Sequence, residues 1–192
     1  MKDFSLVLAS GSAYRRQLLA RLGIVFETWS PEVDEGALPG ESPRETAHRL
    51  ARTKARAAQA IFPGAFIVGS DQVAELDRRP IGKPGNRGNA REQLRMMRGR
   101  AVQFHTAVCL LAGERLQEET VTTEVAFREL TDAEIERYLD REPAFDCAGS
   151  AKSEVLGIAL LERLRGDDPT ALVGLPLIAL SRMLRAEGVE VP

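Results

Sequence analysis

The chain has 192 residues, which is enough for one domain with a sizeable buried core, so folding requires no disulfide or metal staples. Its composition, 44% hydrophobic and 28% charged, is that of an ordinary globular protein and excludes the disordered and fibrous classes. The formal net charge is -2 and the basic clusters are short, which argues against DNA or RNA as a partner. A small anionic ligand needs only a few arginines and lysines in one place.

The sequence also predicts where the protein works. No apolar run approaches the roughly 18 residues that span a bilayer, so we expect no membrane partner. The N-terminal segment reads as a strand followed by a loop rather than as an export signal, which predicts a cytoplasmic protein. Cys109 and Cys147 lack CxxC spacing and are expected to be reduced, partly buried thiols.

The first part of the chain alternates short apolar runs with helical patterns. We expect strands at residues 5–9, 24–29 and 65–70, and helices at residues 14–22 and 42–62. The longer helix is the best defined, because Ser42 and Glu45 give a capping box and Pro43 stands at the first helical position. Asp71 and Gln72 are expected where the third strand finishes, the edge at which α/β sheets bind ligands.

The second part begins with residues 77–89, a loop rich in glycine and proline that contains Lys83. Two extended runs separated by Gly113-Glu114-Arg115 predict an antiparallel pair of strands at residues 102–111 and 117–128. Helices are expected at residues 90–97, 131–139 and 176–187, and a further strand at residues 157–161.

The loop after the first strand has the chemistry of a phosphate cradle. Ser10-Gly11-Ser12 offers hydroxyl and backbone N–H groups at the start of a helix, and Arg15 and Arg16 follow directly. Taken alone, such a loop is more often only a turn.

Acidic residues recur in the segments that flank the strands, at Glu35, Asp71 and Glu154. Each one alone is more often a solvated or capping carboxylate. Together they could hold Mg²⁺ or Mn²⁺, which prefer oxygen ligands and keep waters for a phosphate-bound substrate.

Lysine is rare in this arginine-rich chain, occurring only at Lys54, Lys83 and Lys152 besides Lys2. A lysine in such a background suggests a point charge at a phosphate, although an exposed lysine is an equally good interpretation. His48 and His105 have no partner at metal-ligand spacing. The sequence contains neither GxSxG nor GxxxxGK[ST], so serine-hydrolase and P-loop mechanisms are not supported.

Seven motifs, in this order, resemble the Maf family of nucleotide pyrophosphatases over nearly the whole chain. They are LASGS with Arg15-Arg16, VDE ending at Glu35, Lys54 in a long helix, GSDQV, GKP, CAGSAKSE and DDPTALVGLPL. The branch that hydrolyses dTTP and UTP carries arginine where this chain has Tyr14. The aromatic residue therefore favours the YceF-like branch, which acts on 7-methyl-GTP.

The resemblance implies one domain over residues 1–192. Its fold would be α/β, with a long twisted mixed sheet flanked by helices and two lobes around a central cleft, as in inosine triphosphatases. Homodimers are common in the family. The resemblance implies catalytic roles for Arg15, Asp71 and Lys83, metal binding by Glu35 and Asp71, and substrate binding by Ser10, Tyr14, Arg16, Lys54, Gln72, Lys152 and Glu154.

The implied reaction converts a nucleoside triphosphate, 7-methyl-GTP in this branch, into a monophosphate and pyrophosphate, which removes modified nucleotides from the pool. A divalent cation, Mg²⁺, Mn²⁺ or Co²⁺, would be the cofactor. Asp71 is the preferred general base, although either acid could bind metal or accept the proton. Tyr14 or Trp29 would stack on a positively charged methylated guanine, or would simply pack.

Other classes of function stay open from the sequence. A kinase or nucleotidyltransferase would yield orthophosphate or a transferred group, and a dTTP/UTP pyrophosphatase would differ only in the preferred base. The family's association with arrested septum formation also suggests a regulator of cell division that binds nucleotides without turnover.

Overall fold

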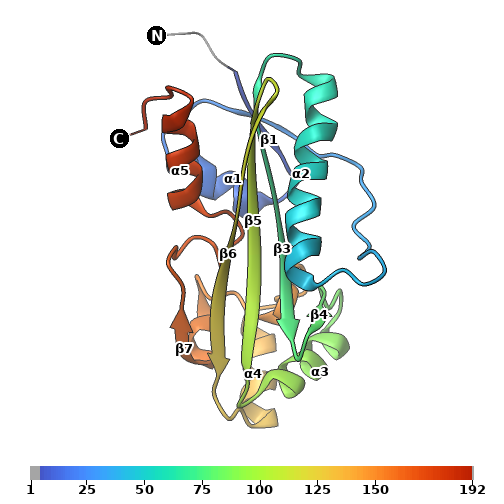
Figure 1. Ribbon diagram of the computed structural model, residues 1–192. Helices are drawn as coiled ribbons and strands as arrows, with labels where there is room; N and C mark the ends of the chain where they lie inside the picture. The colour runs from blue at the N-terminus through green and yellow to red at the C-terminus, as the bar shows by residue number, and fades with distance from the viewer. Residues whose placement is uncertain (1–4, 192) are drawn as a thin grey trace.

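The computed structural model describes residues 5–191 and contains one seven-stranded mixed sheet in the order β2-β1-β3-β5-β6-β7, with β4 paired to β3 (Figure 1). In chain order the elements are β1 (Leu6–Ala9), α1 (Ala13–Ala20), β2 (Glu27–Trp29), α2 (Pro43–Ile61), β3 (Phe66–Leu76), β4 (Arg79–Ile81), α3 (Arg87–Met97), β5 (Ala101–Ala112), β6 (Arg115–Phe127), α4 (Asp132–Arg141), the 3-10 turns η1 (Ala148–Ser150) and η2 (Leu156–Leu160), β7 (Leu161–Arg165) and α5 (Leu177–Ala186). This mixed α/β sheet flanked by helices confirms the predicted fold class.

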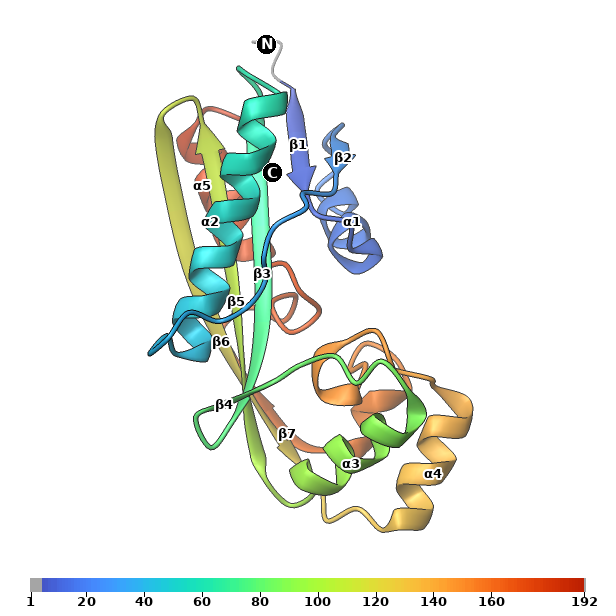
Figure 2. The same ribbon diagram turned by 90° about the vertical axis from the view of Figure 1, so that its right-hand side faces the viewer.

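Three apolar clusters divide the molecule into two halves. In the first half, α2 packs on one face of β1, β3 and β5, and α1 with α5 packs on the other face. The strands alternate accordingly: Leu6 and Leu8 face one cluster, whereas Val7 and Ala9 face the other. In the second half, α3 and α4 cover the far ends of β5 and β6 (Figure 2). The long strands β3, β5 and β6 extend through both halves.

Helix α2 lies very close to β3 because both surfaces are small at the contact. Ala47, Ala51, Ala55 and Ala58 form its buried face, and a Cβ on Gly69 of β3 would lie 2.1 Å from the Ala51 carbonyl oxygen. The helix begins at the predicted capping box, with Ser42 accepting from the Glu45 N–H and Glu45 accepting from the Ser42 N–H. This close packing brings the long side chain of Lys54 to the surface of the sheet.

Strand β3 continues well beyond Ser70, so the prediction that Asp71 and Gln72 lie at its end is wrong. Pairing with β5 extends from Phe66 to Glu75 and holds the strand straight through both residues. On its other side, β3 pairs with β1 through residues 66–69 and with β4 through residues 74–76. Asp71 and Gln72 therefore lie in a gap between two partner strands, beside the carboxyl end of β1.

Two further strand predictions differ from the structure. The predicted strand at residues 24–29 begins only at Glu27, since β1 pairs with residues 27–29 while Ile24 and Phe26 pack against the α1 and α5 cluster. Most of the predicted strand at residues 157–161 lies instead in the 3-10 turn η2 (Leu156–Leu160), where Gly157 packs against the Lys152 backbone with no room for a Cβ. The strand β7 follows, at Leu161–Arg165.

The predicted loop at residues 77–89 contains the short strand β4. Asp77 and Arg78 have φ angles of 51° and 64°, the left-handed conformation of a type I′ hairpin turn, which is usually formed by asparagine or glycine. Helix α3 begins at Arg87, three residues earlier than expected, because Asn86 caps it. Among residues 5–191, no helix is long and apolar enough to cross a membrane.

Candidate active site

A lysine joins two acidic residues at the gap in β3. Lys54 Nζ on α2 lies 2.7 Å from Asp71 Oδ1 on β3 and 2.5 Å from Glu35 Oε1 in the segment after β2. Lys54 and Asp71 are buried, whereas the Glu35 side chain is 59% exposed. Its hydrogen bond to Lys54 lowers the pKa of Glu35, and the positive charges of Lys83 and Arg15 act in the same direction. Glu35 and Asp71 therefore lie on either side of the Lys54 ammonium group.

Arg15 lies beside this group and is held by two oxygen acceptors. Its Nε donates to the Gly174 carbonyl at 2.8 Å, and its Nη1 donates to Ser10 Oγ at 3.3 Å. Removal from water lowers the pKa of Arg15, and the negative charges of Asp71 and Glu35 oppose this effect. The guanidinium group is thus positioned before any ligand arrives.

The loop between β1 and α1 has the predicted form. Ser12 caps α1 by accepting from the Arg15 N–H, and Ser10 Oγ accepts from the Ser12 N–H at 3.2 Å. A Cβ on Gly11 would lie 2.7 Å from Ser30 Oγ, so only glycine fits there without movement. The helix start and the nearby Arg15 form a surface suited to an anion.

Lys83 and Arg16 are exposed, and their side chains form no hydrogen bond or ion pair among residues 5–191. The influence of Lys83 on the pKa of Glu35 places it near the same group. Gln72 has a different environment: its Nε2 donates to Thr106 Oγ1 and to the carbonyls of Ala171 and Leu172. Gln72 therefore fixes the segment that leads to Gly174.

Lys152 and Glu154 lie in a second group, which also contains Tyr14. They line a cavity of about 250 Å³ between α1 of the first half and residues 142–155 of the second half, together with Glu142 and Val173. This cavity is next to the group around Arg15, because two of its lining residues, Tyr14 and Val173, directly precede Arg15 and Gly174 in the sequence.

Sequence reasoning missed the residues that hold Arg15 in place. The Gly174 carbonyl accepts from Arg15 and lies 3.0 Å from the buried Ser70 hydroxyl, whose single proton is shared between this carbonyl and that of Ala107 at 2.8 Å. The buried Asp168 accepts from the backbone N–H groups of Thr170 and Ile178, which fixes the turn on either side of Gly174. Asp168 and Gly174 lie in the motif DDPTALVGLPL and Ser70 lies in GSDQV, but their contacts involve backbone groups, which the sequence does not reveal.

The site fits a divalent cation by its donor set. Two carboxylates, Glu35 and Asp71, already converge on one positive charge, the Lys54 ammonium. Mg²⁺ is commonly bound by one or two carboxylates, with water and substrate phosphates completing the shell. Among residues 5–191, no group of three or more His, Cys, Asp or Glu side chains forms a metal site made of protein ligands alone.

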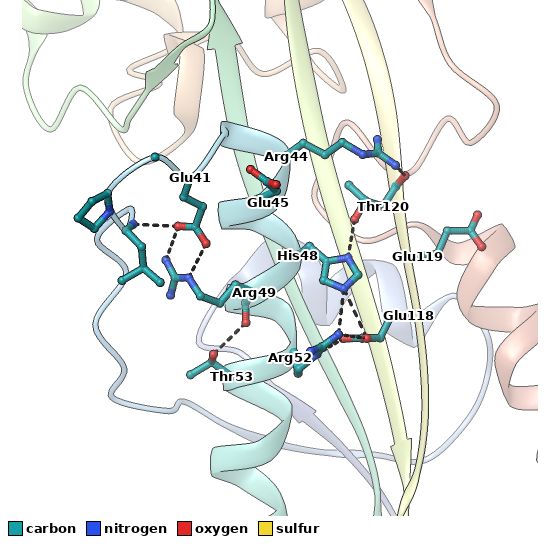
Figure 3. A pocket seen from close by; sticks show the side chains of 13 residues that line it. Glu41, Arg44, Glu45, His48, Arg49, Arg52, Thr53, Glu118, Glu119 and Thr120 are labelled. Carbon is teal, nitrogen blue, oxygen red and sulfur yellow. Dashed lines mark hydrogen bonds and ion pairs between the residues drawn. The ribbon is translucent and has the colours of Figure 1, made fainter.

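A larger cavity, of about 810 Å³, lies elsewhere, between the first half of α2 and β6 (Figure 3). Its charged groups neutralise one another: Arg49 pairs with Glu41, and Arg52 pairs with Glu118. His48 points toward Thr120 and Glu118 in the same network. Arg15 and Asp71 do not line this cavity, so it is separate from the group around Lys54.

The gap beside β3 in this α/β sheet gathers cations and carboxylates, a set of groups suited to a small polyanion. Residues 5–187 match the family model described as Maf-like protein, and the chain belongs to the Maf family.

Two relatives named 7-methyl-GTP pyrophosphatase are each 58% identical to the chain. That of Xanthomonas oryzae pv. oryzae (strain MAFF 311018) aligns over 187 residues, 97% of this chain and 98% of the relative. That of Aromatoleum aromaticum (strain DSM 19018 / LMG 30748 / EbN1) aligns over 194 residues, 100% of both. The crystal structure of protein VC0702 from Vibrio cholerae shares the fold, with a TM-score of 0.50 and 13% identity over 97% of this chain and 99% of that one.

Proposed function

We propose that the chain hydrolyses nucleoside triphosphates to a nucleoside monophosphate and pyrophosphate, with 7-methyl-GTP as its preferred substrate. The observation that carries this proposal is the meeting of Arg15, Glu35, Lys54 and Asp71, from four separate segments, at one gap in the sheet. The naming of relatives at 58% identity over nearly the whole chain supports the choice of reaction and base.

The charges of the site suit a triphosphate. Arg15, Lys54 and Lys83 offer three positive charges, and the Ser10 hydroxyl and the N–H groups of its loop offer hydrogen bonds to phosphate oxygens. These groups neutralise the negative charge that builds on the leaving pyrophosphate. The Ser70, Gln72 and Asp168 contacts keep the Gly174 segment, and with it Arg15, in a fixed position.

The chemical step is attack of a water oxygen on the α-phosphorus, with cleavage of the bond from that phosphorus to the oxygen that bridges to the β-phosphate. Asp71 is suited to accept the proton of the water. Its Oδ1 is held by Lys54, while its Oδ2 forms no hydrogen bond among residues 5–191. Glu35 and Asp71 would hold the divalent ion, Mg²⁺, Mn²⁺ or Co²⁺, which when bound supplies polarisation of the α-phosphate and acidifies a bound water.

The test incubates the protein with Mg²⁺, Mn²⁺ or Co²⁺ and a panel of 7-methyl-GTP, GTP, dTTP and UTP, and separates pyrophosphate from orthophosphate. We expect pyrophosphate, and the highest kcat/KM with 7-methyl-GTP. Orthophosphate or a transferred group would indicate a kinase or transferase, and binding without turnover with every metal would indicate a regulator. A strong preference for dTTP would place the chain in the other branch.

The Asp71→Asn variant tests the general base. It should release no pyrophosphate while its circular dichroism spectrum stays that of the parent protein, and Lys83→Ala should lose most of the rate. Full activity in Asp71→Asn refutes the role of Asp71 as base.

We further propose that the protein forms a homodimer, as the family resemblance implies. Light scattering coupled to size-exclusion chromatography tests it directly, because the monomer mass is 21.0 kDa.

A further inference from the structure

Lys152 occupies a cage made of one aromatic ring and two carboxylates. Its Nζ lies 5.6 Å from the centroid of the Tyr14 ring, 3.2 Å from Asp146 Oδ1 and 3.6 Å from Glu142 Oε1. The Tyr14 hydroxyl donates to Asp146 Oδ2 at 2.9 Å, which fixes the ring relative to the carboxylate. This arrangement is that of a cation-binding site, and a side chain of the protein itself fills it.

The charge of the cage favours a cation. Burial lowers the pKa of Lys152, but interactions with Tyr14 and Asp146 outweigh it, so the net change in this pKa is upward. Burial raises the pKa of Asp146, but hydrogen bonds from Tyr14 and Lys152 lower it overall. Asp146 is thus favoured in its charged form by Tyr14 and Lys152, and Glu142 forms the second ion pair of the cage.

The position of the cage suits the base of a bound nucleotide. Tyr14 adjoins Arg15 on α1, whereas Glu142, Asp146 and Lys152 come from the second half of the molecule. The cavity that Tyr14 and Lys152 line is also bordered by the apolar side chains of Leu18 and Val173. The lining also includes the polar side chains of Gln17, Arg21 and Glu154, so a base here would contact both apolar and polar groups, next to the proposed phosphate site.

We propose that Glu142 and Asp146, beside the Tyr14 ring that the sequence already suggests as a stacking partner, determine specificity for a nucleotide with a positively charged base, and that Lys152 fills their cage until such a base replaces it. This inference rests on the proposed function and assigns its base site. A guanine methylated at N7 carries a fixed positive charge for the Tyr14 ring, and its N1–H and N2–H groups can donate to the carboxylates. A neutral base that displaced Lys152 would remove the positive partner of Glu142, whose side chain is 21% exposed, and of the more exposed Asp146, so it is disfavoured relative to a cationic base.

The first experiment separates charge from shape. The kcat/KM of the parent protein is measured with 7-methyl-GTP, with GTP and with 7-methyl-7-deaza-GTP, which has the methyl group at the same place on a neutral ring. We expect both neutral substrates to be poorer than 7-methyl-GTP by about tenfold or more, which corresponds to about 1.4 kcal/mol. Equal rates for 7-methyl-GTP and its deaza analogue would overturn the proposal, because shape would then explain the preference.

The second experiment uses the double variant Glu142→Gln/Asp146→Asn, with Glu114→Gln at the β5–β6 hairpin as an unrelated carboxylate control. The ratio of kcat/KM for 7-methyl-GTP to that for GTP should fall about tenfold in the double variant and stay at the parent value in the control. Tyr14→Leu should reduce the ratio similarly, whereas Tyr14→Phe keeps the ring and should retain most of it. An unchanged ratio in the double variant refutes the proposal.

A binding measurement keeps this inference distinct from the proposed activity. If the parent protein hydrolyses no triphosphate, the proposed function fails, and calorimetric titration with 7-methyl-GMP and with GMP still tests the cage. Tighter binding of 7-methyl-GMP in the parent and its loss in the double variant would support the inference. Equal affinity for the two monophosphates in the parent would overturn it.

Discussion

Lys54 Nζ donates a 2.7 Å hydrogen bond to Asp71 Oδ1, which joins the buried face of α2 to the middle of β3. This hydrogen bond lies near Gly69, whose missing side chain allows α2 and β3 to pack closely. The same ammonium reaches Glu35, so one side chain orients both acids of the site.

Lys54→Met should lower kcat/KM by about 100-fold, a loss typical of removing one charge-stabilising donor from an active site. It should also lower the free energy of unfolding by about 1–3 kcal/mol, because the buried Asp71 carboxylate loses its partner. Steady-state kinetics and urea denaturation measure the two effects. Arg56→Ala, an exposed position on the same helix, is the control and should change neither.

Gly69→Ala should destabilise the protein by about 2 kcal/mol or more, since the added Cβ would overlap the Ala51 carbonyl oxygen and force α2 away from β3. Activity should fall with stability, because Lys54 moves with the helix. The matched control is Gly82→Ala, where a Cβ would have no atom within 4 Å. Thermal unfolding that is equal in the two variants would contradict the account of this contact.

Ser70→Ala should cost about 1 kcal/mol of stability, the usual contribution of one buried hydrogen bond. Because the Ser70 hydroxyl also holds the Gly174 carbonyl, the variant should lose activity beyond its loss of stability. Activity measured well below the unfolding temperature separates the two effects. Ser5→Ala, at an exposed position, should match the parent protein, and a Ser70→Ala enzyme with parent kinetics would remove Ser70 from the support of Arg15.

Acid should weaken the contact between α3 and α4. Glu136 forms ion pairs with Arg87 and Arg91, and its hydrogen bonds to Arg91 and Arg87 lower its pKa from 4.5 to about 2. Because the pKa of Glu136 is lower in the folded than in the unfolded chain, its ion pairs stabilise the folded state at pH values above about 4.5. This stabilisation is lost as the pH falls from about 4.5 toward about 2. Urea denaturation over this pH range should therefore show a shallower decline for Glu136→Gln than for the parent protein. Glu114→Gln should keep the parent slope.

The sequence predicted the elements whose signals are local. The capping boxes at Ser42 and Thr131 begin α2 and α4 as expected, and the turn at Gly113 joins β5 to β6. The acids and cations of the site were also found, because each is a chemically distinctive residue in a loop or strand. Their predicted roles remain predictions, although the structure brings Arg15, Glu35, Lys54 and Asp71 together.

The sequence could not predict features that depend on partners far away in the chain. The length of β3 is set by β5, which begins some thirty residues later, so the end of the apolar run at Ser70 was misleading. The turn at Asp77-Arg78 lacks the usual residues for its conformation. Asp146 and Glu142 look like ordinary surface acids until the fold places them beside Tyr14, 132 residues away from Asp146.

The two long antiparallel strands β3 and β5 act as a spine shared by both halves of the molecule. Phosphate groups would be held in one half and the base against the other, so the separation of the two is set by paired backbone rather than by a flexible linker. The distance between the phosphate groups and the base would then be fixed by the backbone of these strands. Side chains such as Lys152 would adjust to different bases.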